Sequence, residues 1–206
     1  MPYVREPRLK PVPIESLRPT QITAGFREVE AMRARWRKRS ARKDKEFLRG
    51  HLVPVVLGPK GRHYVIDHHH LCLALEREKQ KFVLVTVVAD LSRLTRDAFF
   101  VFLDNRGWMH PFDETGKRRA YSDIPKTLAG LKDDPYRSLA GAVRREGGYA
   151  KDTEPFSEFL WADYFRRRIK AAVLQKDFDD AVRAALGLAR KNDAAYLPGW
   201  CGASGS

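Results

Sequence analysis

The stretch between residues 52 and 89 constrains the fold most strongly, because strand-like and helical patterns follow one another in a fixed order. Two apolar runs, at 52–57 and 62–66, flank Gly58-Pro59-Lys60-Gly61, and turn residues between two apolar runs predict a β-hairpin. A helix is predicted at 68–79, and the Val-rich run at 82–89 predicts a further, central strand.

The segment before the hairpin adds a strand and a helix. Residues 11–19 are bracketed by prolines, which predicts a short edge strand, and residues 20–25 predict a loop. Apolar residues then recur at helical spacing, so residues 26–48 predict a helix, with Gly50 as its stop.

The second half of the chain has mostly helical patterns. Thr95 is predicted to cap a helix that runs through Leu103, and residues 107–125 predict a long irregular segment. Further helices are predicted at 136–146, 155–172 and 178–191. The patterns therefore predict an α+β fold with a small sheet and an α-helical C-terminal half packed on it. Its predicted units are an α/β core at 1–106, a helical part at 107–200 and a flexible tail at 201–206.

Composition excludes several protein classes. No apolar run approaches the roughly 20 residues that span a membrane, so no membrane partner is predicted. The first residues lack the apolar stretch of a secretion signal. Two cysteines, Cys72 and Cys201, make no disulfide framework, which favours a reducing, cytoplasmic location. Nothing in the sequence indicates an oligomeric state.

The charge points to a partner that carries phosphate. The formal net charge is +13 and the isoelectric point is about 10. The densest basic run lies at 33–43, and smaller clusters lie at 117–119, 144–145 and 166–168. Such a balance favours polyanions, although a single cluster is also compatible with a solvated helix face. Charge by itself does not separate DNA from a free nucleotide.

Asp67-His68-His69-His70 stands at the predicted junction between strand and helix, and this is the main candidate site. The first turn of a helix offers unpaired N–H groups and a positive dipole end to an anion. Consecutive helical residues point about 100° apart, so the three histidines cannot all ligate one metal. One alternative is a phosphate or nucleotide site, with Asp67 as cap, metal ligand or general base. The others are a zinc site in which one or two of the histidines join Asp67 or His110, and a structural cap with incidental histidines.

Other polar pairs are weaker candidates. Glu28 and Glu30 lie in the first turn of the long helix. There they either interact favourably with the positive end of the helix dipole, or serve as a general base or a Mg²⁺ ligand. Arg137 and Ser138 follow a predicted helix start and could hold a phosphate, or form a cap and a surface ion pair. Cys72 and the aromatic stripe from 156 to 165 are predicted to pack in the core.

The chain resembles the ParB/sulfiredoxin superfamily, and within it the stand-alone bacterial branch of ParB-like nucleases. Leu17-Arg18-Pro19-Thr20-Gln21 with Gly25 is similar to the first box of that branch. Val65-Ile66-Asp67-His68-His69-His70-Leu71 resembles its second box, Asp-Gly-His-His-Arg. Pro155-Phe156 through Ala162 resembles a later stretch. The resemblance implies a small mixed sheet of the ParB/sulfiredoxin type and a second box that binds nucleotide phosphates.

Transferred by position, the resemblance implies a nucleotide site and also shows departures from the family pattern. By position, the resemblance places Asp67, His69 and His70 at the phosphates. Together with the candidates above, the predicted ligand contacts are Arg18, Gln21, Thr23, His68, His69, His70, Arg137 and Ser138. His68 replaces the glycine of the second box, Leu71 replaces its arginine, and Gln21 stands near the catalytic glutamate of the related serine kinases. Cys72 is three residues beyond the sulfiredoxin cysteine position, which argues against a reductase.

Two hypotheses follow. The first is a phosphotransferase or phosphohydrolase that uses ATP, ADP or CTP with Mg²⁺ and acts on a small molecule. Its predicted catalytic residues are Asp67, which also binds the metal, His69, Glu28 and Glu30. The second is a DNA-associated, partition-like or nuclease-like protein that binds nucleic acid through its basic helix at 33–43.

Overall fold

The structure is a computed structural model that describes residues 10–38, 47–48 and 50–202, and its centre is a curled five-stranded sheet. The strand order is β1-β6-β4-β5-β2, and β4 pairs antiparallel with β5 and parallel with β6, so the sheet is mixed. Its strands are β1 (Lys10–Pro13), β2 (Arg18–Pro19), β4 (Val53–Gly58), β5 (Arg62–Val65) and β6 (Phe82–Asp90). A separate parallel pair consists of β3 (Thr23–Ala24) and β7 (Lys132–Asp133).

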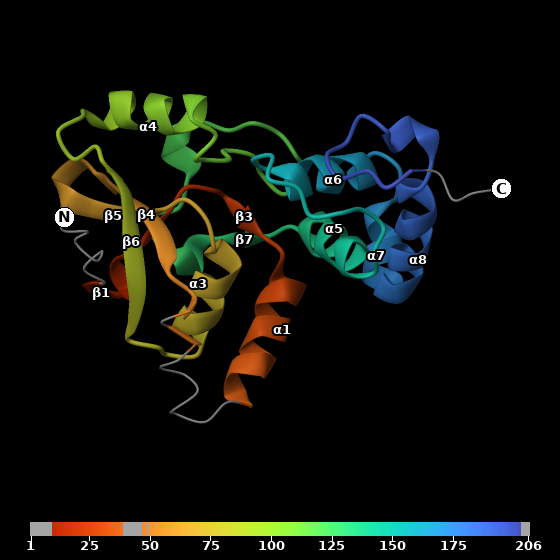
Figure 1. Cartoon of the computed structure of the whole chain (residues 1–206), viewed down its shortest axis with the longest axis horizontal. Helices are drawn as coiled ribbons and strands as arrows, with labels where there is room; N and C mark the ends of the chain where they lie inside the picture. The colour runs from red at the N-terminus through yellow and green to blue at the C-terminus, as the bar shows by residue number, and fades with distance from the viewer. Residues whose placement is uncertain (1–9, 39–46, 49, 203–206) are drawn as a thin grey trace, which may run out of the picture.

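Helices cover both faces of the sheet. Side chains of successive strand residues point to opposite faces, so each face packs against a different helix. Val55 packs with α3 (His69–Arg77), whereas its neighbour Val56 packs with α4 (Arg96–Asn105). α1 (Phe26–Arg37) lies beside α3, and α4 crosses the opposite side of the sheet (Figure 1). The other helices are α5 (Pro135–Arg145), α6 (Ser157–Arg166), α7 (Ala171–Lys176) and α8 (Phe178–Ala189). Short 3-10 helices are η1 (Ile14–Ser16), η2 (Pro59–Gly61), η3 (Tyr121–Asp123), η4 (Leu128–Gly130) and η5 (Asn192–Ala194).

The segment predicted as one edge strand at 11–19 forms two strands on opposite edges of the sheet. β1 pairs antiparallel with β6, η1 then redirects the chain, and β2 pairs in parallel with β5. The prediction of a single strand was wrong, although both strands are edge strands as predicted. Proline has no N–H to donate to a neighbouring strand, so Pro11, Pro13 and Pro19 fit such edges.

Two helices differ from their predicted length. α1 ends at Arg37 rather than continuing to residue 48, and residues 39–46 and 49 lie outside the described part of the chain. The single helix predicted at 155–172 is divided into α6 and α7. Between them the carbonyl of the buried Ile169 accepts a hydrogen bond of 2.6 Å from the hydroxyl of Tyr136 in α5. The predicted loop at 20–25 contains β3.

The other predicted elements are confirmed. The hairpin consists of β4, η2 and β5, the next helix is α3, and β6 is an inner strand. Thr95 caps α4 by accepting a hydrogen bond from the N–H of Ala98, and residues 107–125 are largely irregular. An α+β fold with a mixed sheet and a helical C-terminal half was therefore predicted correctly. In the described residues no helix combines the length and apolar character needed to span a membrane.

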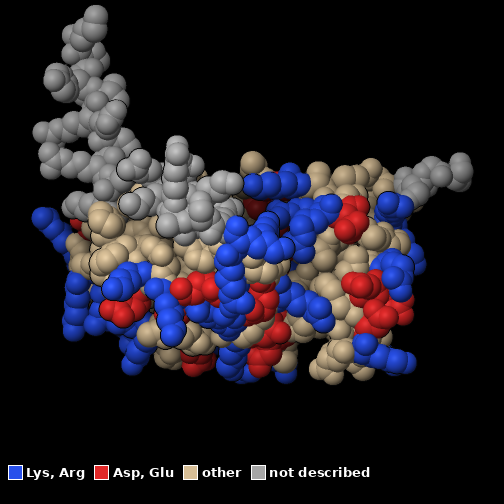
Figure 2. All heavy atoms as spheres, turned by 90° about the horizontal axis from the view of Figure 1, so that it is seen from below, with Lys and Arg blue, Asp and Glu red and all other residues tan. Residues whose placement is uncertain are grey.

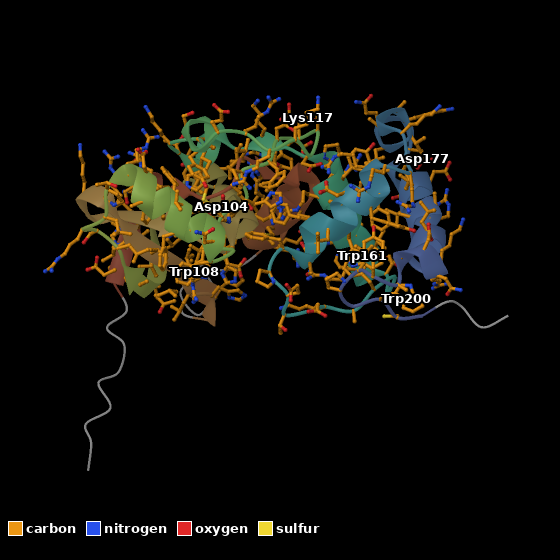
Figure 3. All side chains as sticks on the ribbon, turned by 90° about the horizontal axis from the view of Figure 1, so that it is seen from above. Asp104, Trp108, Lys117, Trp161, Asp177 and Trp200 are labelled. Atoms are coloured by element: carbon orange, nitrogen blue, oxygen red, sulfur yellow. The ribbon has the colours of Figure 1, made fainter. Side chains whose placement is uncertain are left out.

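The C-terminal helices have a core of their own beside the α/β part. Trp161 is completely buried among α5, α6 and α8 and stacks on Tyr149 at a centroid distance of 4.3 Å (Figure 3). Its indole N–H donates a hydrogen bond of 2.8 Å to the carbonyl of Pro198. Most of the aromatic stripe of α6 is thus core, as predicted. Cys72 is a buried free thiol, and burial raises its pKa, which agrees with a packing role.

We predict that Leu73→Ala lowers the free energy of unfolding by about 2–5 kcal/mol, because Leu73 is completely buried between α3 and the sheet. Denaturant unfolding of the purified protein measures the change. Leu160→Ala is the matched control, since this leucine is 43% exposed on α6, and it should change the free energy much less. Equal losses in the two variants would contradict the assigned core.

Candidate anion-binding site

A cavity of about 570 Å³ lies where the N-terminal ends of several helices meet. α1 and α3 form one wall, and α5, the first turn of α6 and the linker at 151–156 form the other. Figure 1 shows that this region joins the α/β part to the C-terminal helices. The cavity is polar beside the start of α3 and apolar along Met32, Trp36 and Leu75.

The N-terminus of α3 offers free hydrogen-bond donors to this cavity. The N–H groups of His69, His70 and Leu71 have no acceptor among the residues that the structure describes. Asp67 Oδ1 accepts a hydrogen bond of 2.7 Å from the N–H of His68, directly before the helix. Free N–H groups and the positive dipole end favour a bound anion at this position.

Arg137 adds to the same cavity a buried positive charge that forms no ion pair with a described residue. Its side chain is nearly fully buried, and its Nε and Nη1 have no hydrogen-bond partner in the described structure. The guanidinium carbon lies 3.3 Å from the centre of the Phe159 ring, so the cation lies over an aromatic face. No described carboxylate lies within 4 Å of it. A buried arginine without a counter-ion is costly, and an anionic ligand would supply the missing charge.

Two histidines of the triplet have structural partners. His69 Nε2 accepts a hydrogen bond of 3.2 Å from the N–H of Thr20, and His70 Nε2 accepts one of 2.9 Å from the N–H of Gly25. Burial lowers the pKa of each histidine to about 3, and the charge of Arg137 contributes in the same direction. Both rings are therefore neutral and tie the loop before α1 to α3.

The two candidate glutamates lie in different surroundings. Glu28 is buried at the cavity, forms an ion pair with Arg145 and packs against Gly141 of α5, where a larger residue would collide with its carboxylate. Glu30 lies outside the cavity lining and pairs with Arg33 and Arg77 on the surface. Only Glu28 is thus brought to the predicted site.

The remaining predicted ligand contacts also differ in whether they line the cavity. Gln21 is buried and lines the cavity. Thr23 lies buried within β3, and Arg18 donates a hydrogen bond of 2.7 Å to the carbonyl of Lys126, so neither lines the cavity. Ser138 Oγ accepts a hydrogen bond of 3.3 Å from the N–H of Arg27 and thereby supports the start of α1.

Metal binding has limited support from the protein side chains alone. In the described part of the chain no group of three or more His, Cys, Asp or Glu residues is placed to hold a metal ion. Asp67 is an exposed carboxylate at the cavity and could complete the shell of an ion that arrives on a phosphate ligand. This donor set fits Mg²⁺, which usually keeps waters and phosphate oxygens as ligands.

The described arginines of the basic run at 33–43 are partly neutralised. Arg33 and Arg37 both bind Glu78, at 2.7 and 2.6 Å, and these bonds, that of Arg37 foremost, lower the pKa of Glu78 to about 2. Residues 39–43 lie outside the described residues. Figure 2 shows basic and acidic side chains interspersed on one face of the molecule.

Similarity to known proteins identifies the family. Residues 10–167 match the family described as "Putative ParB-like nuclease". The chain belongs to this ParB-like family. It is also similar to protein Atu1540 from Agrobacterium tumefaciens, whose crystal structure superposes with a TM-score of 0.89 at 52% identity over 96% of this chain and 100% of that chain. No curated protein matches the sequence.

Membership of the ParB-like family agrees with the resemblance seen in the two sequence boxes. Sequence reasoning did not find Phe159, which was assigned to the core although it lines the cavity and supports Arg137. Periodicity alone could not separate the two roles, since the first turn of α6 faces the cavity while its later turns face the core. The apolar cavity wall with Trp36 was also missed.

We predict that the protein loses stability as the pH falls from about 6.5 to about 3. The pKa values of His69, His70 and His110 are about 3 in the folded state, lowered from 6.5 mainly by burial. The unfolded state therefore binds more protons in this window. The stability that the neutral histidines contribute is fully present above about pH 6.5 and is lost as the pH falls toward 3. Denaturant unfolding at a series of pH values measures how the free energy of unfolding depends on pH. His110→Phe should make this dependence shallower. A free energy of unfolding that does not change with pH in wild type would contradict the burial of neutral histidines.

Proposed function

We propose that this ParB-like protein is a nucleotide-dependent phosphotransferase or phosphohydrolase that acts on a small molecule. The observation that carries the proposal is the buried, unpaired Arg137 at a cavity that also receives the free N–H groups of α3. In this arrangement, phosphate oxygens would accept hydrogen bonds from His69, His70 and Leu71 N–H and neutralise the guanidinium. Positioning and charge stabilisation of this kind account for most catalysis of phosphoryl transfer.

The rest of the cavity supports a ligand larger than inorganic phosphate. Its volume of about 570 Å³ is in the range of roughly 300–1,000 Å³ that is common for small-molecule sites. Beyond the polar end, Met32, Trp36 and Leu75 offer an apolar wall with an indole ring. A nucleotide base or another flat apolar group fits such a wall. ATP, ADP and CTP are therefore the ligands to test, each with Mg²⁺ bound to the phosphates and to Asp67.

The alternative function is binding or cleavage of nucleic acid, which the family description favours. Its predicted surface is the basic helix at 33–43. The ion pairs of Arg33 and Arg37 with Glu78 reduce the positive charge that this surface offers to DNA phosphates, because paired guanidinium groups release fewer counterions from DNA. The cavity, with its single buried cation, has the character of a small-molecule site, so we prefer the first function.

We predict micromolar binding of at least one of these nucleotides by calorimetry, and its loss in Arg137→Met. A ligand at a hundred times its Kd should raise the melting temperature by about 5–10 °C in a chain of this size. Arg137→Met should keep the melting temperature of the ligand-free protein, because it removes a buried charge that forms no ion pair with a described residue, and should abolish the rise. Arg137→Lys, which keeps the charge without the planar fork, should bind more weakly than wild type. Absence of binding to every nucleotide would reject this function.

We also predict that Arg33→Glu/Arg37→Glu leaves nucleotide binding unchanged, since both side chains bind Glu78 away from the polar end of the cavity. The same variant tests the alternative through its affinity for duplex DNA at several salt concentrations. A steep salt dependence in wild type that becomes shallow in the variant would favour nucleic acid as the partner. Circular dichroism controls for loss of α1.

A further inference from the structure

Arg137 is one layer of a stack of three flat side chains. Its guanidinium carbon lies 3.3 Å from the centre of the Phe159 ring, and the centre of the His110 ring lies 3.7 Å from the same point. One face of a phenyl ring has no room for two groups at these distances, so Arg137 and His110 lie on opposite faces of Phe159. The order is therefore guanidinium, phenyl, imidazole. Of the three residues, only Arg137 and Phe159 line the cavity.

The imidazole of His110 serves the stack as a flat packing surface. Its ring also contacts Phe112 at 4.5 Å and Phe156 at 5.2 Å between ring centres. Its Nδ1 is buried and makes no hydrogen bond to the described residues. Burial lowers the pKa of His110 to about 3, and the charges of nearby arginines, Arg137 foremost, act in the same direction. The ring is therefore neutral at physiological pH and can pack close to an arginine without repulsion.

The backbone of Thr20 connects this stack to the start of α3. The buried Thr20 accepts, through its carbonyl, a hydrogen bond of 2.9 Å from the N–H of His110. The N–H of Thr20 donates to Nε2 of His69, in the first turn of α3. One residue thus joins the two elements that the proposed function places at the phosphate, which are the N–H groups of α3 and the guanidinium of Arg137. This connection holds the two elements at a fixed spacing.

We propose that His110 and Phe159 are positioning residues, which hold the guanidinium of Arg137 in register with the N–H groups of α3 so that it binds phosphate. The inference rests on the proposed function, from which it takes the phosphate at Arg137. An arginine side chain has several rotatable bonds, and holding it in place beforehand removes an entropy cost from ligand binding. Stacking on an aromatic face leaves the N–H donors at the edge of the guanidinium available. Nε and Nη1 of Arg137, which have no partner among the described residues, are such donors.

The test measures the affinity of the full chain for ATP with Mg²⁺, and for inorganic pyrophosphate, by calorimetry. Phe159→Leu replaces the flat ring with an apolar side chain and should weaken both affinities at least about tenfold. His110→Leu should weaken them about three- to tenfold, because it acts through Phe159. His110→Phe keeps a flat ring and should recover most of the affinity that His110→Leu loses. Denaturant unfolding checks that each variant is folded under the conditions of the titration.

Two comparisons separate positioning from a general loss of structure. Phe178→Leu is the matched control, because Arg27 lies over the Phe178 ring at 4.1 Å but Phe178 does not line the cavity. This control should leave both affinities unchanged. In an Arg137→Lys background, Phe159→Leu should cost less than about twofold, since an ammonium group has no plane that a ring can orient. A purely structural role of Phe159 would instead give the same loss in both backgrounds.

The outcomes distinguish this inference from the proposed function. If wild type binds pyrophosphate but no nucleotide, the proposed function is rejected, and the pyrophosphate titrations still decide the role of the stack. If wild type binds neither ligand, both are rejected. If Phe159→Leu and His110→Leu bind ATP as tightly as wild type, only the positioning role is rejected. Equal losses in the two Arg137 backgrounds, or a His110→Phe variant as weak as His110→Leu, would also reject it.

Discussion

The meeting of helix ends around Gly25 is the contact on which the rest of the site depends. The N–H of Gly25 donates to His70 at the start of α3, and the N–H of Arg27 donates to Ser138 at the start of α5. A Cβ on residue 25 would lie 2.8 Å from Ser138 Oγ, so only glycine allows this approach. The N-terminal ends of three helices are thereby held together, and the cavity lies between them.

This arrangement brings positive groups together at the polar end of the cavity, and Arg137 forms no ion pair there with a described residue. The start of α3 contributes free N–H groups, and α5 contributes the buried Arg137, whose guanidinium rests on Phe159 of α6. The family arginine of the second box is replaced by Leu71, and Arg137 enters the cavity from a distant segment of the chain. In our proposal, Arg137 of α5 therefore binds the phosphate in place of the family arginine that this sequence lacks.

The histidine triplet shows how one motif divides into separate roles. His69 and His70 were predicted as ligand contacts because they match the family box. Their Nε2 atoms accept hydrogen bonds from the N–H groups of Thr20 and Gly25, so these side chains position the loop that leads into α1. His68, which departs from the family box, is the one whose ring remains free at the cavity. One motif thus contributes two structural side chains and one side chain that makes no hydrogen bond to the described residues.

The sequence by itself determined the hairpin, α3, the inner strand β6 and the position of Asp67-His68-His69-His70 at the start of α3. These features depend on local patterns of apolar residues, turn residues and helix starts, which neighbouring residues specify. Only the tertiary structure decided that β1 and β2 take opposite edges, that Glu28 but not Glu30 reaches the cavity, and that Arg137 is unpaired there. Those outcomes depend on contacts between segments distant in sequence, and no local periodicity encodes which partner a buried side chain meets.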